Sequence, residues 1–256
     1  MQDQLFAAEP APLHQDTQPS RLKGKRVAIA GGTTGIGRAA ALMLAGEGAR
    51  LFVVGRRAER VHELARQSGG TIAGTTADLA TQEGIEDFFA RAAAELGRLD
   101  VAIMAAGLPG GALSEMEAKD IRYMLDVNFT AGVMGAKAVH EHMDEGDIVI
   151  IGSTSAHDLT PGSTVYAGAK AGLAGFAEAL RRELGPKGIR VTLIEPGLTG
   201  TDIHGMDLES ERPRQMIAED EMLLPEDVAE TIRFALTRPR RATIQSISIV
   251  PRNSSE

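Results

Sequence analysis

The 256-residue sequence contains no cysteine and no tryptophan, and only two tyrosines, Tyr123 and Tyr166. The absence of cysteine excludes disulfide bonds, thiolate catalysis and cysteine-ligated zinc or iron–sulfur centres, and it fits a reducing compartment. We therefore expect a cytoplasmic protein without a metal site. Because tyrosine is so scarce, a function for either phenol is easy to test by substitution.

The sequence also lacks an apolar run near the ~20 residues needed to cross a bilayer, so we expect no membrane association. The first residues have Asp3 early, several prolines and glutamines and no sustained apolar core, unlike a signal or transit peptide. We interpret residues 1–22 as a flexible N-terminal arm, either disordered or docked on a partner.

Basic side chains number 27 against 35 acidic ones, which gives a formal net charge of −8. That acidic balance argues against a nucleic-acid partner. The hydrophobic content of 43% and the charged content of 24% are ordinary for a globular protein. A chain of this length can bury a large core, so residues 23–256 are expected to form one domain.

Short apolar runs alternate with longer helical stretches from Lys25 onward, a pattern typical of a parallel sheet covered on both faces. This alternation predicts a single doubly wound, Rossmann-type α/β domain whose mostly parallel seven-stranded sheet is flanked by helices. The expected strands are 26–30, 51–54, 71–76, 101–104, 147–151, 190–194 and 244–250, and the expected helices are 36–47, 57–67, 82–96, 116–142, 165–184 and 226–236.

One long irregular segment, residues 198–224, interrupts this alternation with glycine, proline, methionine and charged residues. A segment of that length inside a compact domain is usually a lid or a disordered loop. We expect it to be a substrate lid.

A glycine-rich turn, Ala30-Gly-Gly-Thr-Thr-Gly-Ile-Gly37, follows the first strand and opens the first helix. Unpaired backbone N–H groups and the helix dipole point at one spot there, which favours an anion. Gly31 permits the tight turn, Gly35 lets a pyrophosphate approach the backbone, and Gly37 lets the helix pack close to the strand. The alternative is a tight connection that binds no ligand.

The end of the second strand indicates which dinucleotide binds. An NAD-preferring site places a carboxylate there to bind the ribose hydroxyls, whereas this chain has Gly55 followed by Arg56 and Arg57. Two guanidinium groups and no acid favour NADP(H), with its 2′-phosphate, over NAD(H). The alternative is that both arginines only solvate the start of a helix.

Ser153, Tyr166 and Lys170 are the candidate catalytic residues. Tyr166 and Lys170 lie four residues apart, on one face of an expected helix. Ser153 follows the fifth strand at its carboxyl end, where open α/β sheets bind ligands. A lysine ammonium at ~4 Å offers a phenolate about 4 kcal/mol at an effective dielectric of ~20. We therefore expect Lys170 to lower the pKa of Tyr166, so that this phenol exchanges a proton near neutral pH.

With these motifs in this order, the chain from Gly24 to Pro251 resembles the classical short-chain dehydrogenase/reductase family. The resemblance implies a nicotinamide cofactor and a homodimer or homotetramer whose apolar helices pair across a two-fold axis. The motifs that carry it are the glycine turn, Asp78-Leu79 after the third strand, Asn128, Ser153, Tyr166-x-x-x-Lys170, and Glu195-Pro-Gly-Leu-Thr-Gly-Thr201.

The resemblance also implies roles for individual residues. Tyr166 would protonate the carbonyl oxygen as hydride arrives, and Ser153 would polarise that oxygen. Lys170 would lower the tyrosine pKa and bind the nicotinamide ribose, while Asn128 would hold a water in the proton relay. The implied cofactor contacts are Gly31, Thr33, Thr34, Gly35, Ile36, Gly37, Arg56, Arg57, Asp78 at the adenine, Leu79, Ala105, Ala106, Gly107 at the adenine ribose, Tyr166, Lys170, Pro196, Gly197, Thr199, and Thr201 at the carboxamide.

The chain departs from the family's pattern at two places. Ala30 stands where the glycine turn usually begins with threonine, and Met104-Ala105-Ala106-Gly107 replaces the usual Asn-Asn-Ala-Gly. Losing one member of a buried polar network strands its partner at about 1–3 kcal/mol, whereas removing both can be nearly neutral. We expect the two segments to meet below the cofactor in a repacked, functional floor.

These features predict an NADP-dependent short-chain alcohol dehydrogenase or carbonyl reductase that transfers hydride between nicotinamide and a small alcohol or carbonyl substrate. The alternative is a cofactor-binding sensor or scaffold of the same fold that has lost turnover. An enoyl reductase is disfavoured, because its tyrosine and lysine lie farther apart in the chain. The loops 108–115 and 154–163 contain no arginine, so no carboxylate clamp is evident, and His157 in the second loop is expected to be solvated.

Overall fold

Among the residues that the structure describes, seven short segments form one sheet in the order β3-β2-β1-β4-β5-β6-β7, and every neighbouring pair is parallel. The computed structural model describes residues 21–201 and 210–254. The doubly wound fold is confirmed, with a sheet that is wholly rather than mostly parallel. The strands are β1 (Arg26–Ala30), β2 (Arg50–Gly55), β3 (Ile72–Thr76), β4 (Val101–Met104), β5 (Gly146–Ile151), β6 (Ile189–Pro196) and β7 (Ser246–Ile249).

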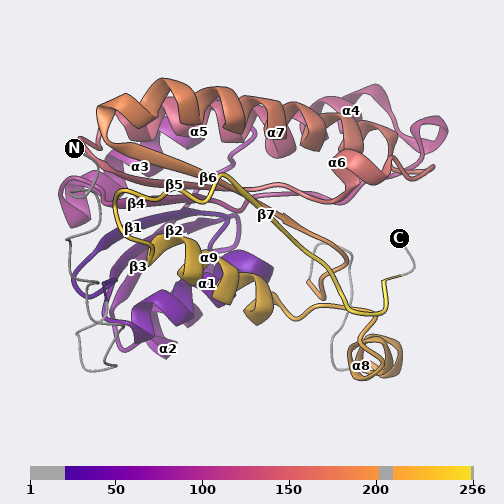
Figure 1. Ribbon diagram of the computed structural model, residues 1–256, viewed down its shortest axis with the longest axis horizontal. Coiled ribbons are helices and arrows are strands. Elements are labelled where there is room, and N and C mark those ends of the chain that lie inside the picture. The colour runs from indigo at the N-terminus through magenta and orange to yellow at the C-terminus, as the bar shows by residue number, and fades with distance from the viewer. Residues whose placement is uncertain (1–20, 202–209, 255–256) are drawn as a thin grey trace, which may run out of the picture.

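Helices cover both faces of the sheet, and each face has its own apolar core (Figure 1). Side chains alternate between the two cores along each strand, because successive residues point to opposite faces. In β4, Ala102 and Met104 pack into one core and Val101 and Ile103 into the other. One face carries α3 (Gln82–Leu96), α5 (Ala131–His140) and α7 (Thr164–Leu184), and the other carries α1 (Gly35–Gly46), α2 (Ala58–Gln67) and α9 (Pro225–Leu236).

The expected helix over residues 116–142 is confirmed as continuous helical backbone from residue 118 to residue 140, but its geometry changes in the middle. The stretch consists of α4 (Ala118–Leu125), a π-helical segment (Asp126–Thr130) and α5. A π-helical segment inserts one extra residue per turn, which shifts the helix face that follows, and such segments often lie at functional sites. Hydrophobic periodicity does not reveal it, because both neighbouring pieces are helical.

The segment 198–224 is more regular than its sequence predicts. Thr199 forms a parallel bridge with Leu223, and α8 (Glu211–Ala218) is helical. Residues 202–209 of the expected lid and residues 1–20 of the expected arm lie outside the described residues. Leu22, the last residue of that arm, is only 2% exposed and packs in the core beneath α1 and α9.

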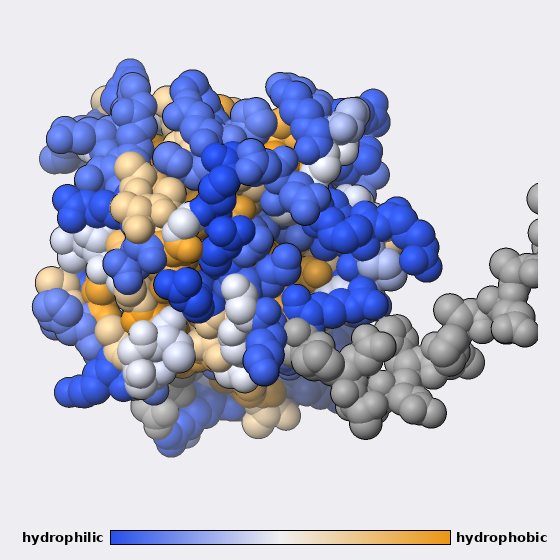
Figure 2. Space-filling view, turned by 90° about the vertical axis from the view of Figure 1, so that its left-hand side faces the viewer, coloured by the Kyte–Doolittle hydropathy of each residue, from blue (hydrophilic) through white to orange (hydrophobic). Residues whose placement is uncertain are grey.

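The face on the left of Figure 1 is mostly hydrophilic, with apolar residues between the charged ones (Figure 2). Along the part of the chain that the structure describes, none of the helices combines the length and apolar content that a bilayer span requires.

Candidate active site

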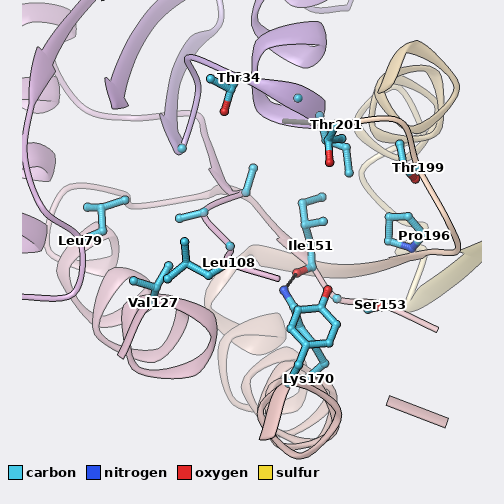
Figure 3. Close-up of a pocket in the computed structure, with 18 of the residues that line it drawn as sticks. Thr34, Leu79, Leu108, Val127, Ile151, Ser153, Lys170, Pro196, Thr199 and Thr201 are labelled. Atoms are coloured by element: carbon cyan, nitrogen blue, oxygen red, sulfur yellow. Dashed lines mark hydrogen bonds between the residues drawn. The ribbon is translucent and has the colours of Figure 1, made fainter. Parts of the chain in front are cut away.

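A cleft lies at the carboxyl ends of the central strands, where the strand order reverses between β1 and β4. Doubly wound sheets bind ligands at this switch point. The cleft contains about 1470 Å³ of empty space, part of it open to solvent. Thr34 and Thr201 line one side, and Ser153 and Lys170 line the opposite side (Figure 3).

The glycine turn forms one wall of the cleft, and at two of its glycines a side chain would not fit. A Cβ at Gly31, which has φ +82°, would lie 2.7 Å from the Ala106 backbone. At Gly35, with φ +49°, a Cβ would lie 3.1 Å from Thr201 Cγ2. Helix α1 begins at Gly35, so the first N–H groups of the helix lack intrahelical partners at this wall. The turn is therefore a backbone cradle of the kind that binds phosphate.

Gly37, predicted as a cofactor contact, does not line the cleft. A Cβ at Gly37 would overlap the carbonyl oxygen of Gly31. This glycine therefore allows α1 to start directly against the turn, which is a packing role.

The end of β2 has no room for the carboxylate of an NAD-type site. A Cβ at Gly55 would overlap the hydroxyl of Thr33 and lie 2.6 Å from its Cγ2. Arg56 lines the cleft beside it, whereas Arg57 does not. The structure thus brings one of the two predicted arginines to the cleft.

The two departures from the family's pattern meet, as the sequence predicts. Ala30 pairs with Met104 in the sheet, and its carbonyl oxygen accepts the N–H of Ala105 at 2.8 Å. Ala30 and Met104 are each 5% exposed. Among the described residues, no buried side-chain nitrogen or oxygen lacks a hydrogen-bond partner. The apolar substitutions therefore leave no polar side chain stranded in this floor.

Ser153, Tyr166 and Lys170 meet in the cleft from two elements. Ser153 follows β5, and Tyr166 and Lys170 lie one turn apart on α7. Lys170 is 4% exposed; its Nζ donates to the Ile151 carbonyl oxygen at 3.0 Å and lies 5.6 Å from the centroid of the Tyr166 ring (Figure 3). Ser153 Oγ accepts the N–H of Ser155 at 3.2 Å, which leaves the serine proton for another acceptor.

The electrostatics of this group differ from the sequence prediction. Burial raises the pKa of Tyr166, and a hydrogen bond with Ser153 opposes that rise. Burial also lowers the pKa of Lys170 to about 8. The prediction that Lys170 lowers the pKa of Tyr166 is wrong for this structure, because removing the phenolate from water costs more than nearby groups return. Tyr166 is therefore a protonated phenol at neutral pH.

Asn128 lies in the π-helical segment and is 1% exposed. Its Oδ1 accepts the N–H of Leu108, and its Nδ2 donates to the Leu108 carbonyl oxygen, both at 3.1 Å. Asn128 itself does not line the cleft, whereas Leu108 does. The side chain thus positions the loop after β4.

The structure brings most of the predicted site residues to the cleft. The exceptions are Gly37, Arg57 and Asn128. The predicted residues that line it are Gly31, Thr33, Thr34, Gly35, Ile36, Arg56, Asp78, Leu79, Ala105, Ala106, Gly107, Ser153, Tyr166, Lys170, Pro196, Gly197, Thr199 and Thr201.

Other lining residues carry no recognisable motif. Tyr123, which lies outside the catalytic pattern, and Val127 line the cleft four residues apart. Their spacing could have indicated from the sequence that they lie on the same side of a helix, since residues four apart share a helix face. The remaining ones follow strand ends or lie in loops, and they are Val54, Gly55, Ala77, Leu108, Gly110, Ile151, Gly152, Thr154, Ser155, Ser163 and Leu198.

Comparison with known families adds to this geometry. The family described as short chain dehydrogenase matches residues 25–212. The chain belongs to the short-chain dehydrogenase/reductase family. This dehydrogenase/reductase is therefore an oxidoreductase, and the matched range includes the glycine turn, Ser153, Tyr166 and Lys170.

Relatives and solved structures agree with that assignment. The dehydrogenase/reductase is 29% identical over 235 residues to an uncharacterized oxidoreductase of Staphylococcus aureus strain USA300, which covers 90% of this chain and 98% of the relative. It is 31% identical over 219 residues to carbonyl reductase family member 4 of Xenopus tropicalis, covering 84% and 92%. A short chain dehydrogenase from Burkholderia cenocepacia J2315 in complex with NADP has a TM-score of 0.81 at 30% identity, covering 90% of this chain and 98% of that one.

Proposed function

We propose that this protein is an NADP(H)-dependent alcohol dehydrogenase or carbonyl reductase in which Tyr166 is the acid–base. The observation that carries the proposal is the meeting of Ser153, Tyr166 and Lys170 in one cleft with the glycine turn. The cleft therefore combines a phosphate cradle with a group that can exchange a proton.

The cradle fits a dinucleotide, and the end of β2 favours the 2′-phosphorylated one. Gly31 and Gly35 have no side chain that would come between a ligand and the backbone N–H groups, so this turn would hold the pyrophosphate. The contact between Gly55 and Thr33 leaves no place for a ribose-binding carboxylate, while Arg56 offers a cation to the 2′-phosphate. The related Burkholderia dehydrogenase, whose structure contains NADP, supports the same preference.

The protein's own residues would manage the proton. The nicotinamide, when bound, exchanges a hydride with the substrate carbon. Tyr166 would donate the Oη proton to the carbonyl oxygen, and Ser153 would hydrogen-bond that oxygen with the proton that Ser155 leaves available. Lys170 uses one of its three ammonium donors on Ile151 and would offer another to the ribose. Because burial raises the pKa of Tyr166, the phenol carries at neutral pH the proton that carbonyl reduction requires.

The substrate end of the cleft fits a small uncharged carbonyl compound. Leu108, Gly110, Ser163 and Leu198 line it. Among the described lining residues, Arg56 and Lys170 are the cations, and both belong to the cofactor contacts. An arginine clamp for a substrate carboxylate is therefore absent from this part of the cleft. The similarity to carbonyl reductase family member 4 is consistent with such substrates.

A turnover assay tests the proposal. We expect the purified protein to oxidise NADPH in the presence of at least one member of a panel of small aldehydes and ketones, and to use NADPH in preference to NADH. Tight NADPH binding without turnover of any substrate would instead support the sensor or scaffold. Failure to bind either cofactor at micromolar concentration would contradict both functions.

A further inference from the structure

Three side chains are joined by hydrogen bonds at the end of the cleft near β2 and β3. Arg56 Nη1 donates to Tyr123 Oη at 3.4 Å. Tyr123 Oη in turn donates to the Asp78 carboxylate, 3.2 Å from Oδ1 and 3.3 Å from Oδ2. Arg56 follows β2, Asp78 follows β3 and Tyr123 lies on α4, so three separate elements supply the chain of contacts. All three residues line the cleft.

The chemistry of the groups fixes the direction of these bonds. A guanidinium only donates and a carboxylate only accepts, whereas a phenol does both with a single proton. The Tyr123 hydroxyl therefore gives its proton to Asp78 and turns a lone pair toward Arg56. Asp78 is also held by the N–H of Ala80, which lies 3.0 Å from Oδ1, so the carboxylate is anchored to its own loop.

The hydroxyl stands between a cation and an anion. Within the described residues, Arg56 and Asp78 form no direct ion pair, although both bond to the same oxygen. Opposite charges at contact distance attract strongly near a protein surface. Without the hydroxyl between them, the guanidinium can pair with the Asp78 carboxylate directly, and a guanidinium paired with a carboxylate is a weaker site for a phosphate.

We propose that Tyr123 determines specificity for the 2′-phosphate of NADP(H) by holding Arg56 in the cleft and separating it from Asp78. The inference rests on the proposed use of NADP(H) and adds a residue to that specificity. Tyr123 acts through Arg56, so it is a positioning residue. NADH, which has no 2′-phosphate, does not depend on it.

The test is the ratio of the NADPH and NADH dissociation constants, measured by titration calorimetry on the full chain. Tyr123→Phe keeps the ring and removes only the hydroxyl. We expect this variant to bind NADPH about tenfold more weakly and NADH within about twofold of wild type, since one charge-assisted hydrogen-bond system is lost. Adenosine 2′,5′-bisphosphate and adenosine 5′-monophosphate should repeat this difference without the nicotinamide half.

A control variant and a rescue variant distinguish the positioning of Arg56 by Tyr123 from a general loss of positive charge or of folded structure. Arg122→Gln removes an exposed cation from the adjacent position on α4 and should leave the ratio unchanged. Asp78→Asn in the Tyr123→Phe background removes the competing anion and should restore the ratio, even if both cofactors lose adenine contacts equally. Asp78→Asn alone measures how far loss of the anion by itself shifts the ratio, and a merely structural tyrosine would give no rescue beyond that shift.

The outcomes are distinguishable. If Tyr123→Phe has the wild-type ratio, or if Asp78→Asn does not restore it, the inference is overturned while the proposed function stands. If the wild-type protein itself binds NADPH no more tightly than NADH, the proposed cofactor preference fails, and this inference fails with it.

Discussion

The burial of the Lys170 ammonium group lowers the stability of the folded protein. The residue is 4% exposed, and burial lowers its pKa from 10.5 to about 8. The unfolded chain holds this proton more tightly than the folded chain, so the lysine destabilises the folded state at neutral pH. The penalty disappears as the pH rises from about 8 to 10.5. Such a cost is typical of a group kept for function.

Replacing this lysine should therefore stabilise the protein. The pKa difference corresponds to an upper limit of about 3 kcal/mol at roughly 1.4 kcal/mol per pKa unit. Loss of the hydrogen bond to Ile151 reduces this gain by roughly 1 kcal/mol. We expect Lys170→Met to raise the free energy of unfolding by about 2 kcal/mol at pH 7, measured by urea denaturation.

The pH dependence distinguishes this explanation from simple repacking. The gain in Lys170→Met should shrink between pH 8 and pH 10, where the wild-type lysine loses its proton. Lys119→Met, at an exposed lysine, should show neither the gain nor the trend. An equal gain at both pH values would contradict the account.

Gly55 and Thr33 should together control the choice of cofactor. Gly55→Asp alone forces a Cβ into the Thr33 side chain, so it should lower the melting temperature and weaken binding of both cofactors. Adding Thr33→Gly removes the overlap. We expect the double variant to shift the NADH-to-NADPH affinity ratio at least about tenfold toward NADH, because a carboxylate binds ribose hydroxyls and repels the 2′-phosphate.

One result with these variants would contradict the prediction. If Gly55→Asp alone is stable and prefers NADH, the contact with Thr33 does not restrict this position. Thr33→Gly by itself serves as the control for loss of the threonine in the cleft.

At the scale of elements, the sequence predicts the central strands well because buried parallel strands are apolar along most of their length, as in β1, β4 and β5. It fails at the π-helical segment (Asp126–Thr130), whose neighbours on both sides are helical. It also misses α8, a polar helix with Pro213 as its buried residue. Hydrophobic periodicity carries no signal in either place.

The candidate site divides in the same way. Residues in local motifs, such as the glycine turn and Tyr166 with Lys170, can be found from spacing. Tyr123 cannot, because its contacts with Arg56 and Asp78 join three elements that are distant in the chain. The pKa of Tyr166 also needs the structure, since the extent of burial decides the direction of its shift.

The loop after β5 is held by a pair that the sequence did not indicate. His157, expected to be solvated, is 63% exposed in its side chain but bonds through Nε2 to Glu195 Oε1 at 2.9 Å. Glu195 lies on β6, with its side chain 6% exposed. The pair therefore ties α6 (Ser155–Asp158) to the sheet beside Thr154, which lines the cleft.

Removing the histidine should leave a buried carboxylate without this partner. We expect His157→Ala to lower the free energy of unfolding by about 1–2 kcal/mol in urea denaturation. Removing both polar groups costs less than removing one, so His157→Ala/Glu195→Leu should recover most of that loss. His62→Ala, at an exposed histidine on α2, is the matched control. A double variant less stable than His157→Ala would argue against this pairing.

At the scale of the whole molecule, the exposed face of α7 is a candidate surface for pairing with a second copy of the chain. Its outer face exposes small residues, among them Ala171, Gly175 and Ala179. A Cβ at Gly175 would meet no atom within 4 Å, so two copies of this helix can approach closely. We propose that the protein is a homodimer or homotetramer that pairs through this face.

Light scattering tests the assembly. Wild type should be a dimer or tetramer, and Gly175→Arg should shift it to a smaller species without loss of secondary structure. Gly46 on α1 is an equally open glycine on the opposite face of the sheet, so Gly46→Arg should not change the number of chains in the assembly. A monomeric wild type would contradict the proposal.

The proposed function depends on proton exchange at Tyr166 in an NADP(H) site. The most direct measurement is carbonyl-dependent oxidation of saturating NADPH by wild type and by Tyr166→Phe, together with their dissociation constants for NADPH. We predict that turnover falls by at least about a hundredfold, the lower range for loss of a general acid, while the dissociation constant stays within about twofold. A Tyr166→Phe protein that retains wild-type turnover would contradict the account.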